Sequence, residues 1–422
     1  MKRILIILLL AGKMVYSQSA DTLTVFQCLK AVESYFPKSK EKQLVDEQTE
    51  LELENIRSGW YPQMDFKVQA TYQSDVIEVG LGNGLPFPVD FPTPSRDQYQ
   101  ATLDVNQLIW DGGSTRSSGK IQKLNSRAQR KSVDVELHKI KQQVSNVYFG
   151  ILLLKKQYAI LENTMDELGK KEKTIQAGVE NGTLLPSDLK TVKAEKLRLE
   201  QNLEEVHRKI EASRDILREL TGIQMGPERV LRQSELEIES SEIQRPENEL
   251  FSVQENQLEA NRELIKSQKR PKIRAFGQLG YGQPGLNMLS EDFSHFYIVG
   301  ARLSWNLWDW NQNKRKRQVV QVQQQMVDVQ RKTFNTHVSV QLKNIRADID
   351  NYRASFKRDK QIIALRQEVV NSARSKLENG VITSSDFISD LNELKNARLT
   401  YEKHRIEWVR AKMNYILTSG NL

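Results

Sequence analysis

The side chains that most often carry catalysis or bind metals are few in this chain and lie far apart. Cys28 is the only cysteine, and the five histidines are His138, His207, His295, His337 and His404. Their spacing matches no metal-binding pattern, and no nucleophile elbow or Ser-His-Asp series stands out. A lone cysteine also excludes an internal disulfide framework. We therefore predict no catalytic residue, no cofactor and no metal site.

Phosphate and nucleic-acid chemistry has little support either. Gly80, Gly82 and Gly84 have a spacing that could cradle a phosphate, but no helix follows them, as such a loop requires. The formal net charge is +8, yet basic and acidic residues mix along the whole chain, which is typical of solvated helix faces. Because no known binding motif accompanies this charge, we predict no nucleic-acid partner.

Length and composition argue against a series of ordinary globular domains. Of the 422 residues, 38% are hydrophobic and 27% are charged, which is too polar for a large core. The longest apolar run, residues 4–11, is far shorter than the roughly 20 residues of a transmembrane helix. Lys2 and Arg3 precede this run, so we interpret residues 1–17 as a secretory signal peptide that is cleaved after Ser17.

The remaining chain contains one structural unit twice. Three short motifs return after the same interval of 198 residues: Trp110-Asp111 as Trp308-Asp309, Asn181-Gly182 as Asn379-Gly380, and Ser187-Asp188 as Ser385-Asp386. A constant interval over so long a span indicates an internal duplication. We place the first repeat at residues 18–222, a connecting segment at 223–247 and the second repeat at 248–422.

Each repeat is predicted to contain one helix, two strands and two long helices. Apolar residues step alternately by three and four through residues 137–168, 189–220 and 338–377, which is the spacing of coiled-coil helices. We place the long helices at about residues 114–222 and 312–418. Residues 114–180 contain no proline, so the first long helix could span about 100 Å. An Asn-Gly turn joins the two long helices of each repeat, because glycine favours the left-handed conformation at a helix end. After the second turn, Thr383 and Asp386 form a capping box.

Two strand pairs are predicted, at about residues 62–109 and 271–307. Polarity alternates at residues 64–72 and 99–106 in the first pair and at residues 272–281 and 296–306 in the second. A period of two over about 9–11 residues is the signature of a transmembrane β-strand. Aromatic residues near the segment ends could lie at the membrane interfaces; they are Trp60, Tyr61, Trp110, Tyr297, Trp305 and Trp308. The opposite, polar face predicts a wet pore without strong selectivity, since it carries both signs of charge on Asp65, Lys67, Asp104, Lys272, Arg274 and Arg302.

Four strands per chain cannot close a barrel, because the smallest closed barrels need about eight. An open sheet edge cannot stay in lipid. The sheet must therefore be completed by strands of other copies of the chain. Three copies would give twelve strands and two copies would give eight, and this arithmetic alone leaves both open.

The order of these elements, their duplication, the Trp-Asp turns after the strands and the Asn-Gly turns followed by Ser-Asp resemble the TolC-like outer-membrane efflux family. The likeness covers nearly the whole mature chain. It implies a mostly α fold with transmembrane β-strands. Long antiparallel coiled-coil helices would form an α-barrel in the periplasm, and each of three chains would give four strands to a 12-stranded β-barrel in outer-membrane lipid.

The resemblance also implies a function. Such a homotrimer is a passive outer-membrane exit duct of a tripartite efflux or type I secretion system. It is coupled to an inner-membrane pump through a periplasmic adaptor, also called a membrane fusion protein. The turns at the far, periplasmic ends of the helix pairs dock the adaptor in the family, which implies this role for Asn181, Gly182, Asn379 and Gly380.

The same ends close the channel in the family, and acidic residues after the second turn line its entrance. Asp386 occupies the first acidic position, whereas the second falls on Ser389, with Asp390 beside it. The family's gate-locking arginine is replaced here by Ile382. A ring of Asp386 carboxylates would favour cations at the constriction.

A second class of protein also fits the residues. The chain could be a secreted periplasmic coiled-coil scaffold or adaptor whose strands form a small soluble β-domain. Strand placement separates the two readings. The duct requires the apolar strand face to meet lipid, and the scaffold requires that face to be an ordinary core.

Overall fold

The computed structural model describes residues 22–77, 93, 95–226, 230–232, 236–238, 242–288, 290 and 292–422. The predicted signal peptide and most of the loop at residues 74–98 lie outside this description, as do the three loop glycines. The described chain divides into two compact units. One contains residues 134–246 and 334–422 together with the N-terminal segment to residue 40, and the other contains residues 41–133 and 247–333. Each unit therefore takes segments from both predicted repeats.

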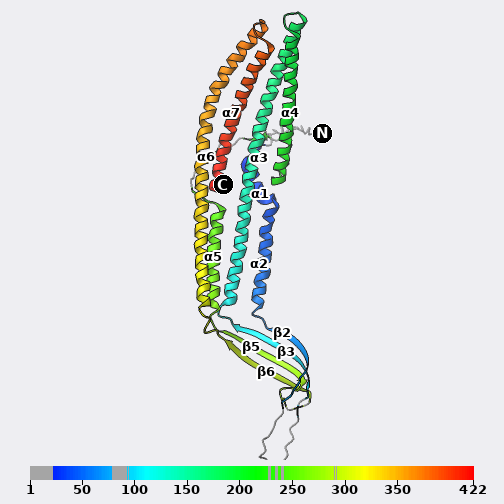
Figure 1. The fold of residues 1–422 in the computed structure, drawn as a ribbon, viewed down its shortest axis with the longest axis vertical. Helices are drawn as coiled ribbons and strands as arrows, with labels where there is room; N and C mark the ends of the chain where they lie inside the picture. The colour runs from blue at the N-terminus through cyan, green and yellow to red at the C-terminus, as the bar shows by residue number, and fades with distance from the viewer. Residues whose placement is uncertain are drawn as a thin grey trace, which may run out of the picture. The chain divides into compact units, whose positions relative to one another are not determined.

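Two helical hairpins dominate the first unit. The first hairpin pairs α3 (Ser114–Glu180) with α4 (Pro186–Thr221), and the second pairs α6 (Gln312–Glu378) with α7 (Ser384–Ser419). Figure 1 shows the two helices of each hairpin side by side over the part that lies in this unit. The helices α3 and α6 both have 67 residues, and α4 and α7 both have 36. These equal lengths confirm the duplication, while the exact bounds of the repeats remain a prediction.

The heptad residues form the core between these hairpins. Their buried side chains come from all four helices and are joined in one cluster, in which Leu168, Val192, Val370 and Phe387 have no exposed surface. Burial of a Leu, Val or Phe side chain typically contributes about 1.5–3 kcal/mol. The coiled-coil pattern read from the sequence is therefore the pattern that packs the helices.

Short elements complete the first unit. Strand β1 (Thr22–Leu23) pairs in parallel with β4 (Val230–Leu231), and the chain then enters α1 (Val25–Tyr35) and a 3-10 turn (Pro37–Lys40). The buried Tyr148 hydroxyl lies 2.7 Å from each of two backbone carbonyl oxygens that flank this ladder. It thereby fixes the ladder to α3, because a buried hydroxyl must keep a hydrogen-bond partner.

The second unit contains α2 (Glu41–Ser58), α5 (Pro246–Ser267) and the first parts of α3 and α6. The Trp-Asp turns begin the two long helices. Asp111 accepts hydrogen bonds from the amides of Gly113, Ser114 and Thr115, and Asp309 accepts one from the Asn313 amide at 3.0 Å. A carboxylate at this position satisfies amides that have no partner inside the helix.

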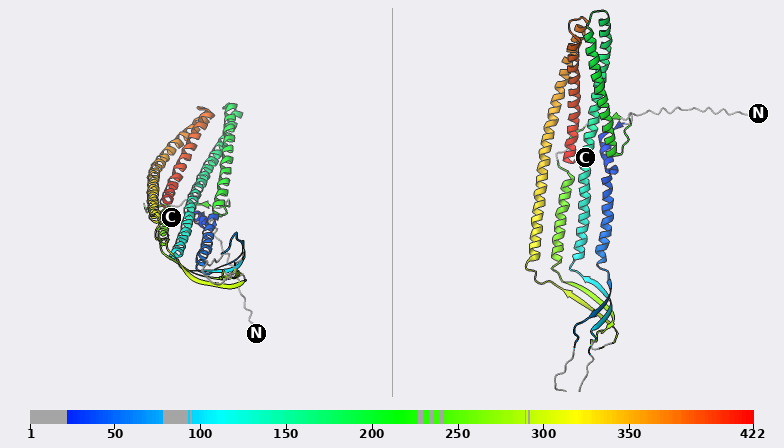
Figure 2. Two further views of the ribbon diagram at one scale, coloured as in Figure 1. Left: turned by 60° about the horizontal axis from the view of Figure 1, so that its bottom comes forward. Right: turned by 45° about the vertical axis from the view of Figure 1, so that its right-hand side comes forward.

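The four long strands of this unit form one antiparallel sheet in the order β2-β3-β5-β6. Their bounds are Gln63–Tyr72, Asp97–Trp110, Lys272–Gln283 and Ser294–Ser304. Strands β2 and β6 are the edges, and Figure 2 shows the sheet curving from one to the other. The predicted alternation is confirmed, although β3 is longer at both ends than the segment at residues 99–106 that the pattern marked.

No helix in the described ranges is long and apolar enough to cross a membrane. Overall, the fold is mostly α with four antiparallel strands, as the sequence predicted.

Candidate functional site

The two turns at the hairpin ends have the same backbone. Gly182 and Gly380 have φ angles of 72° and 69°, in the left-handed region that glycine tolerates best. The amides of Thr183 and Val381, which follow them, each donate a 2.8 Å hydrogen bond to a carbonyl five residues back. These are the helix-end bonds that a glycine cap permits. Asn181 and Asn379 are exposed beside the glycines, so both candidate docking turns present polar groups to solvent.

The second turn leads into α7 through the predicted capping box. The Asp386 carboxylate accepts hydrogen bonds from the Thr383 hydroxyl at 2.7 Å and from the Thr383 amide at 3.0 Å. These bonds hold the pKa of Asp386 below its ordinary value. Ser389 is exposed and Asp390 is half-buried on the following turn of helix. These bonds therefore favour the ionised form of Asp386, while the second position of the family pattern is an uncharged serine.

The first turn has an aspartate at the equivalent position, but it makes different contacts. One oxygen of Asp188 accepts from the Leu185 amide at 3.2 Å. The other oxygen accepts from the Ser384 amide at 3.0 Å, at the start of α7 in the other hairpin. A carboxylate at a helix N-terminus is stabilised by the unpaired amides there. Asp188 thus joins the two hairpins, a role that our sequence analysis missed although the repeat interval singles the residue out.

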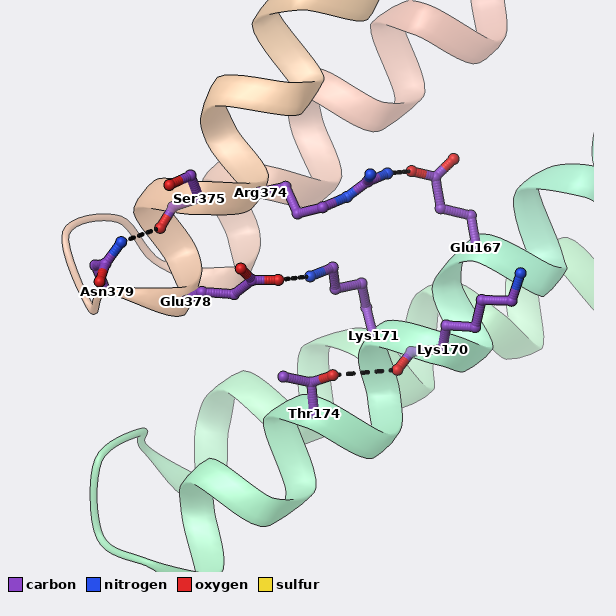
Figure 3. A network of polar contacts seen from close by, with 8 residues as sticks. All are labelled: Glu167, Lys170, Lys171, Thr174, Arg374, Ser375, Glu378 and Asn379. Atoms are coloured by element: carbon purple, nitrogen blue, oxygen red, sulfur yellow. Dashed lines mark hydrogen bonds and ion pairs between the residues drawn. The ribbon is translucent and has the colours of Figure 1, made fainter.

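Ion pairs join the hairpins next to the turns (Figure 3). Lys171 of α3 pairs with Glu378 of α6, and Arg374 of α6 pairs with Glu167 of α3. Lys171 is buried, and its hydrogen bond holds the pKa of Glu378 below the ordinary value. We call these two pairs and the Asp188–Ser384 bond the hairpin seam. A hollow of about 380 Å³ opens between the turns and includes Lys171, Glu378 and Gly380 in its lining.

The polar face of the sheet forms a second candidate surface. Lys67 and Asp104 form a 2.8 Å ion pair between neighbouring strands, and the Gln278 amide also donates to Asp104 at 2.6 Å. The opposite face contains large apolar side chains that no helix covers. Phe66, Val68 and Val299 are 71%, 72% and 74% exposed.

The predicted interfacial aromatics do not divide evenly between the two ends of the sheet. Trp60, Tyr61, Trp110, Trp305 and Trp308 lie at the end where β2 begins and β6 stops, and all five are exposed. Only Tyr297 lies towards the other end, because its register partner is Leu279. A further aromatic group at that end was not predicted from the sequence. There Tyr99 and Tyr281 stack on Phe293 with ring centroids 6.4 and 5.4 Å apart.

The charged residues of both surfaces lack the arrangement of a metal centre. Within the described ranges, no three His, Cys, Asp or Glu side chains gather closely enough to hold an ion. The charged side chains of these surfaces can attract or repel charged solutes.

Comparison with known proteins gives one family and a set of similar folds. Residues 48–223 match the sequence profile of the outer membrane efflux protein family. The sequence matches no curated protein.

Several solved outer-membrane proteins share the fold at low sequence identity. The CusC structure, described in connection with transmembrane channel formation, has a TM-score of 0.72 at 12% identity over 94% of this chain and 91% of its own. The outer membrane protein VceC of Vibrio cholerae has a TM-score of 0.67 at 13% identity, covering 94% and 96%. The MtrE outer membrane channel of Neisseria gonorrhoeae, solved in an open state, has 0.68 at 14% identity, covering 94% and 88%.

Proposed function

Because residues 48–223 match the outer membrane efflux protein family, we propose that three copies of this chain assemble into one passive exit duct. The strands lie in the outer membrane and the helices in the periplasm. Three copies with four strands each close a 12-stranded barrel. A periplasmic adaptor and an inner-membrane pump supply the connection and the driving force, since a passive duct has no energy source of its own.

The uncovered apolar face of the sheet is the observation that carries this proposal. Phe66, Val68 and Val299 are exposed over more than two-thirds of their surface although they belong to a regular sheet. A soluble protein rarely leaves so large an apolar surface in water. In a membrane the same apolar surface contacts lipid and not water, while the polar face of the strands lines a water-filled lumen. This observation favours the duct over the scaffold.

The open edges of the sheet support assembly with other copies. Strands β2 and β6 each have one edge without a partner within the described chain, and lipid offers no hydrogen bonds to replace one. Two copies would give eight strands, whose barrel interior is filled by side chains. Three copies leave an open lumen, which an exit duct requires.

At the periplasmic end, we assign the constriction to Asp386 and the adaptor-docking role to the two Asn-Gly turns. Comparison of the repeats supports Asp386. One carboxylate oxygen of Asp188 accepts a hydrogen bond from the Ser384 amide. The residue equivalent to Ser384 in the first repeat is Pro186. Proline has no amide hydrogen, so Asp386 cannot form the equivalent bond to a neighbouring copy. Its carboxylate stays available to form a ring that attracts cations.

The first experiment tests assembly and location together. Cells expressing the full chain are fractionated, and the detergent-extracted membrane protein is run on a gel with and without heating, its mass being checked by light scattering. We expect an outer-membrane trimer that becomes monomeric on boiling. A soluble periplasmic monomer or dimer would refute the duct.

A pair of substitutions separates the duct from the scaffold. Val68→Arg places a charge on the apolar face, which costs about 2–4 kcal/mol at the middle of a bilayer. Gln69→Arg, one residue further along β2, is the matched control on the polar face. The duct predicts loss of the heat-sensitive trimer for Val68→Arg alone. The scaffold predicts a soluble protein in both cases, with lower thermal stability for the first.

A further inference from the structure

Two arginines lie directly opposite each other on the polar face of the sheet. In the register of β5 and β6, Arg274 pairs with Arg302. Residues opposed in this way point to the same face with Cβ atoms about 4.5–5.5 Å apart. The Arg302 guanidinium lies over the Phe276 ring, 5.4 Å from its centroid. Two neighbouring strands thus bring two guanidinium groups and one aromatic ring together.

The carboxylates of the same face lie on the other two strands. Asp104 of β3 is occupied by Lys67 at 2.8 Å and by Gln278 at 2.6 Å. Asp65 lies one strand further away on β2, directly opposite Asp104. Among the described residues, no carboxylate forms an ion pair with either arginine. The positive and negative side chains predicted for this face are therefore not evenly mixed. The arginines of β5 and β6 have no carboxylate partner within the described chain, whereas the carboxylates lie on β2 and β3.

Like charges placed directly opposite each other destabilise a strand pair. An anion between the guanidinium groups removes this repulsion, and the planar guanidinium matches carboxylate and phosphate oxygens with two parallel hydrogen bonds. A hollow of about 430 Å³ lies here. Its lining includes Arg274, Phe276 and Arg302, and also the ion pair of Lys67 with Asp104, whose negative charge Lys67 balances. The space is large enough for an organic anion.

Aromatic rings give the same surface an apolar part. Phe276 and Phe296 lie flat over two glycines of the neighbouring strands. A Cβ atom on Gly300 would come within 2.8 Å of the Phe276 ring, and one on Gly280 within 2.0 Å of the Phe296 ring. The glycines are thus needed for the rings to lie against the backbone on a face that is otherwise polar.

We propose that Arg274, Arg302 and Phe276 form a binding site for amphipathic organic anions, in which a carboxylate or phosphate meets the guanidinium groups and an apolar body meets the ring. One site is complete within a single chain. The proposed duct adds only that the site faces the lumen and occurs once per copy. Solutes of this class are then held on their way through the barrel.

The test uses the purified full chain in detergent and a water-soluble aromatic polyanion, 5-carboxyfluorescein, with binding followed by fluorescence anisotropy. We expect saturable binding that weakens at least about tenfold in the Arg274→Gln/Arg302→Gln double variant, which corresponds to about 1.4 kcal/mol. The control Arg346→Gln removes an exposed cation of α6 and should bind as the unsubstituted protein does. Rhodamine 6G, an aromatic cation, should not compete.

Two further results keep this test independent of assembly. Arg302→Lys keeps the charge but loses the planar fork, so it should bind the dye more weakly than the unsubstituted protein does. This comparison tests the site even if the double variant fails to fold. Equal affinity in all variants, or equal binding of the cationic dye, would overturn the site. A soluble monomer that still shows arginine-dependent binding would refute the duct and leave the site standing.

Discussion

The two hairpin ends have one backbone and two sets of contacts. Both turns place glycine in the left-handed region, and an aspartate follows six residues later in each. Asp188 of the first hairpin bonds to the second hairpin, whereas the partner of Asp386 within the described residues is Thr383 of its own turn. The duplication therefore preserved the helix geometry while the side chains between hairpins diverged.

The same divergence affects every link of the hairpin seam. In the proposed trimer, the second hairpin of one copy would face the first hairpin of the next. Each seam residue would then be replaced at that interface by its equivalent in the other repeat. Lys171 and Glu378 are replaced by Val369 and Glu180. Glu167 and Arg374 are likewise replaced by Leu365 and Gln176, and neither replacement pair can form an ion pair. In the proposed trimer, these contacts would therefore join the two hairpins of one chain but not the hairpins of neighbouring chains.

This arrangement affects how the periplasmic end would open. Links within a chain keep its two hairpins together, so the easiest separation lies between copies. The tip would then open as three pairs of hairpins rather than as six independent ones.

The largest effect should come from the core beneath the turns. Phe387 has no exposed surface, whereas its repeat equivalent, Leu189, is only partly buried. Phe387→Ala should lower the local free energy of unfolding by about 3–5 kcal/mol, and Leu189→Ala by less, because less surface is withdrawn from water there. Hydrogen exchange at the ends of α4 and α7 measures both. Equal effects would show that the two hairpins are packed alike.

The next effect concerns the seam itself. Lys171→Met keeps the length of a buried side chain and removes its ion pair with Glu378. Amide exchange near the end of α3 should accelerate about 3–10-fold, since a single partly screened pair is worth roughly 1 kcal/mol. Lys170→Met, one residue earlier and exposed, is the matched control. Identical exchange in the two variants would contradict a stabilising seam.

The two helical hairpins could be predicted from the sequence, but the contacts of the hairpin seam could not. The long helices follow from unbroken heptads without proline, and the turns from Asn-Gly, because these signals are local in the chain. The pair Lys171–Glu378 joins residues 207 positions apart, and its existence depends on the stagger of two hairpins, which no local pattern encodes. The uneven distribution of charge on the polar face of the sheet could not be predicted either, because it also depends on contacts between residues far apart in the chain. Arg274 and Arg302 become neighbours only through the register of β5 and β6.

The seam should also respond to pH. The hydrogen bond and charge of Lys171 hold the pKa of Glu378 below its ordinary value of 4.5. Since the folded state binds the proton more weakly than the unfolded state, this stabilisation is present above pH 4.5. It is lost as the pH falls through the lower folded value. Spin labels at Asn181→Cys and Asn379→Cys should report hairpins that separate on acidification.

A substitution assigns this response to one group. Glu378→Gln cannot be deprotonated, so its hairpins should already be looser at neutral pH and should change less on acidification. Glu180→Gln, at the equivalent and exposed position of the first hairpin, should behave as the unsubstituted chain. A response that survives unchanged in Glu378→Gln would assign it to other carboxylates, such as Asp386, whose pKa is also lowered by its bonds to Thr383.

The smallest effect should come from restoring a missing donor between copies. Pro186→Ser supplies an amide hydrogen at the position that corresponds to Ser384, at the exposed start of α4. In the assembled trimer, Asp386 of the neighbouring copy can then accept from it, as Asp188 accepts from Ser384 within the chain. One added hydrogen bond at a wet surface should lower the open fraction of single channels about 2–5-fold. Adding Asp386→Asn should abolish that change if the bond causes it, because an amide oxygen accepts more weakly than a carboxylate. If the open fraction remains reduced in the double variant, the hydrogen bond to Asp386 is not the cause. The effect of Pro186 would then come from the stiffness of its backbone.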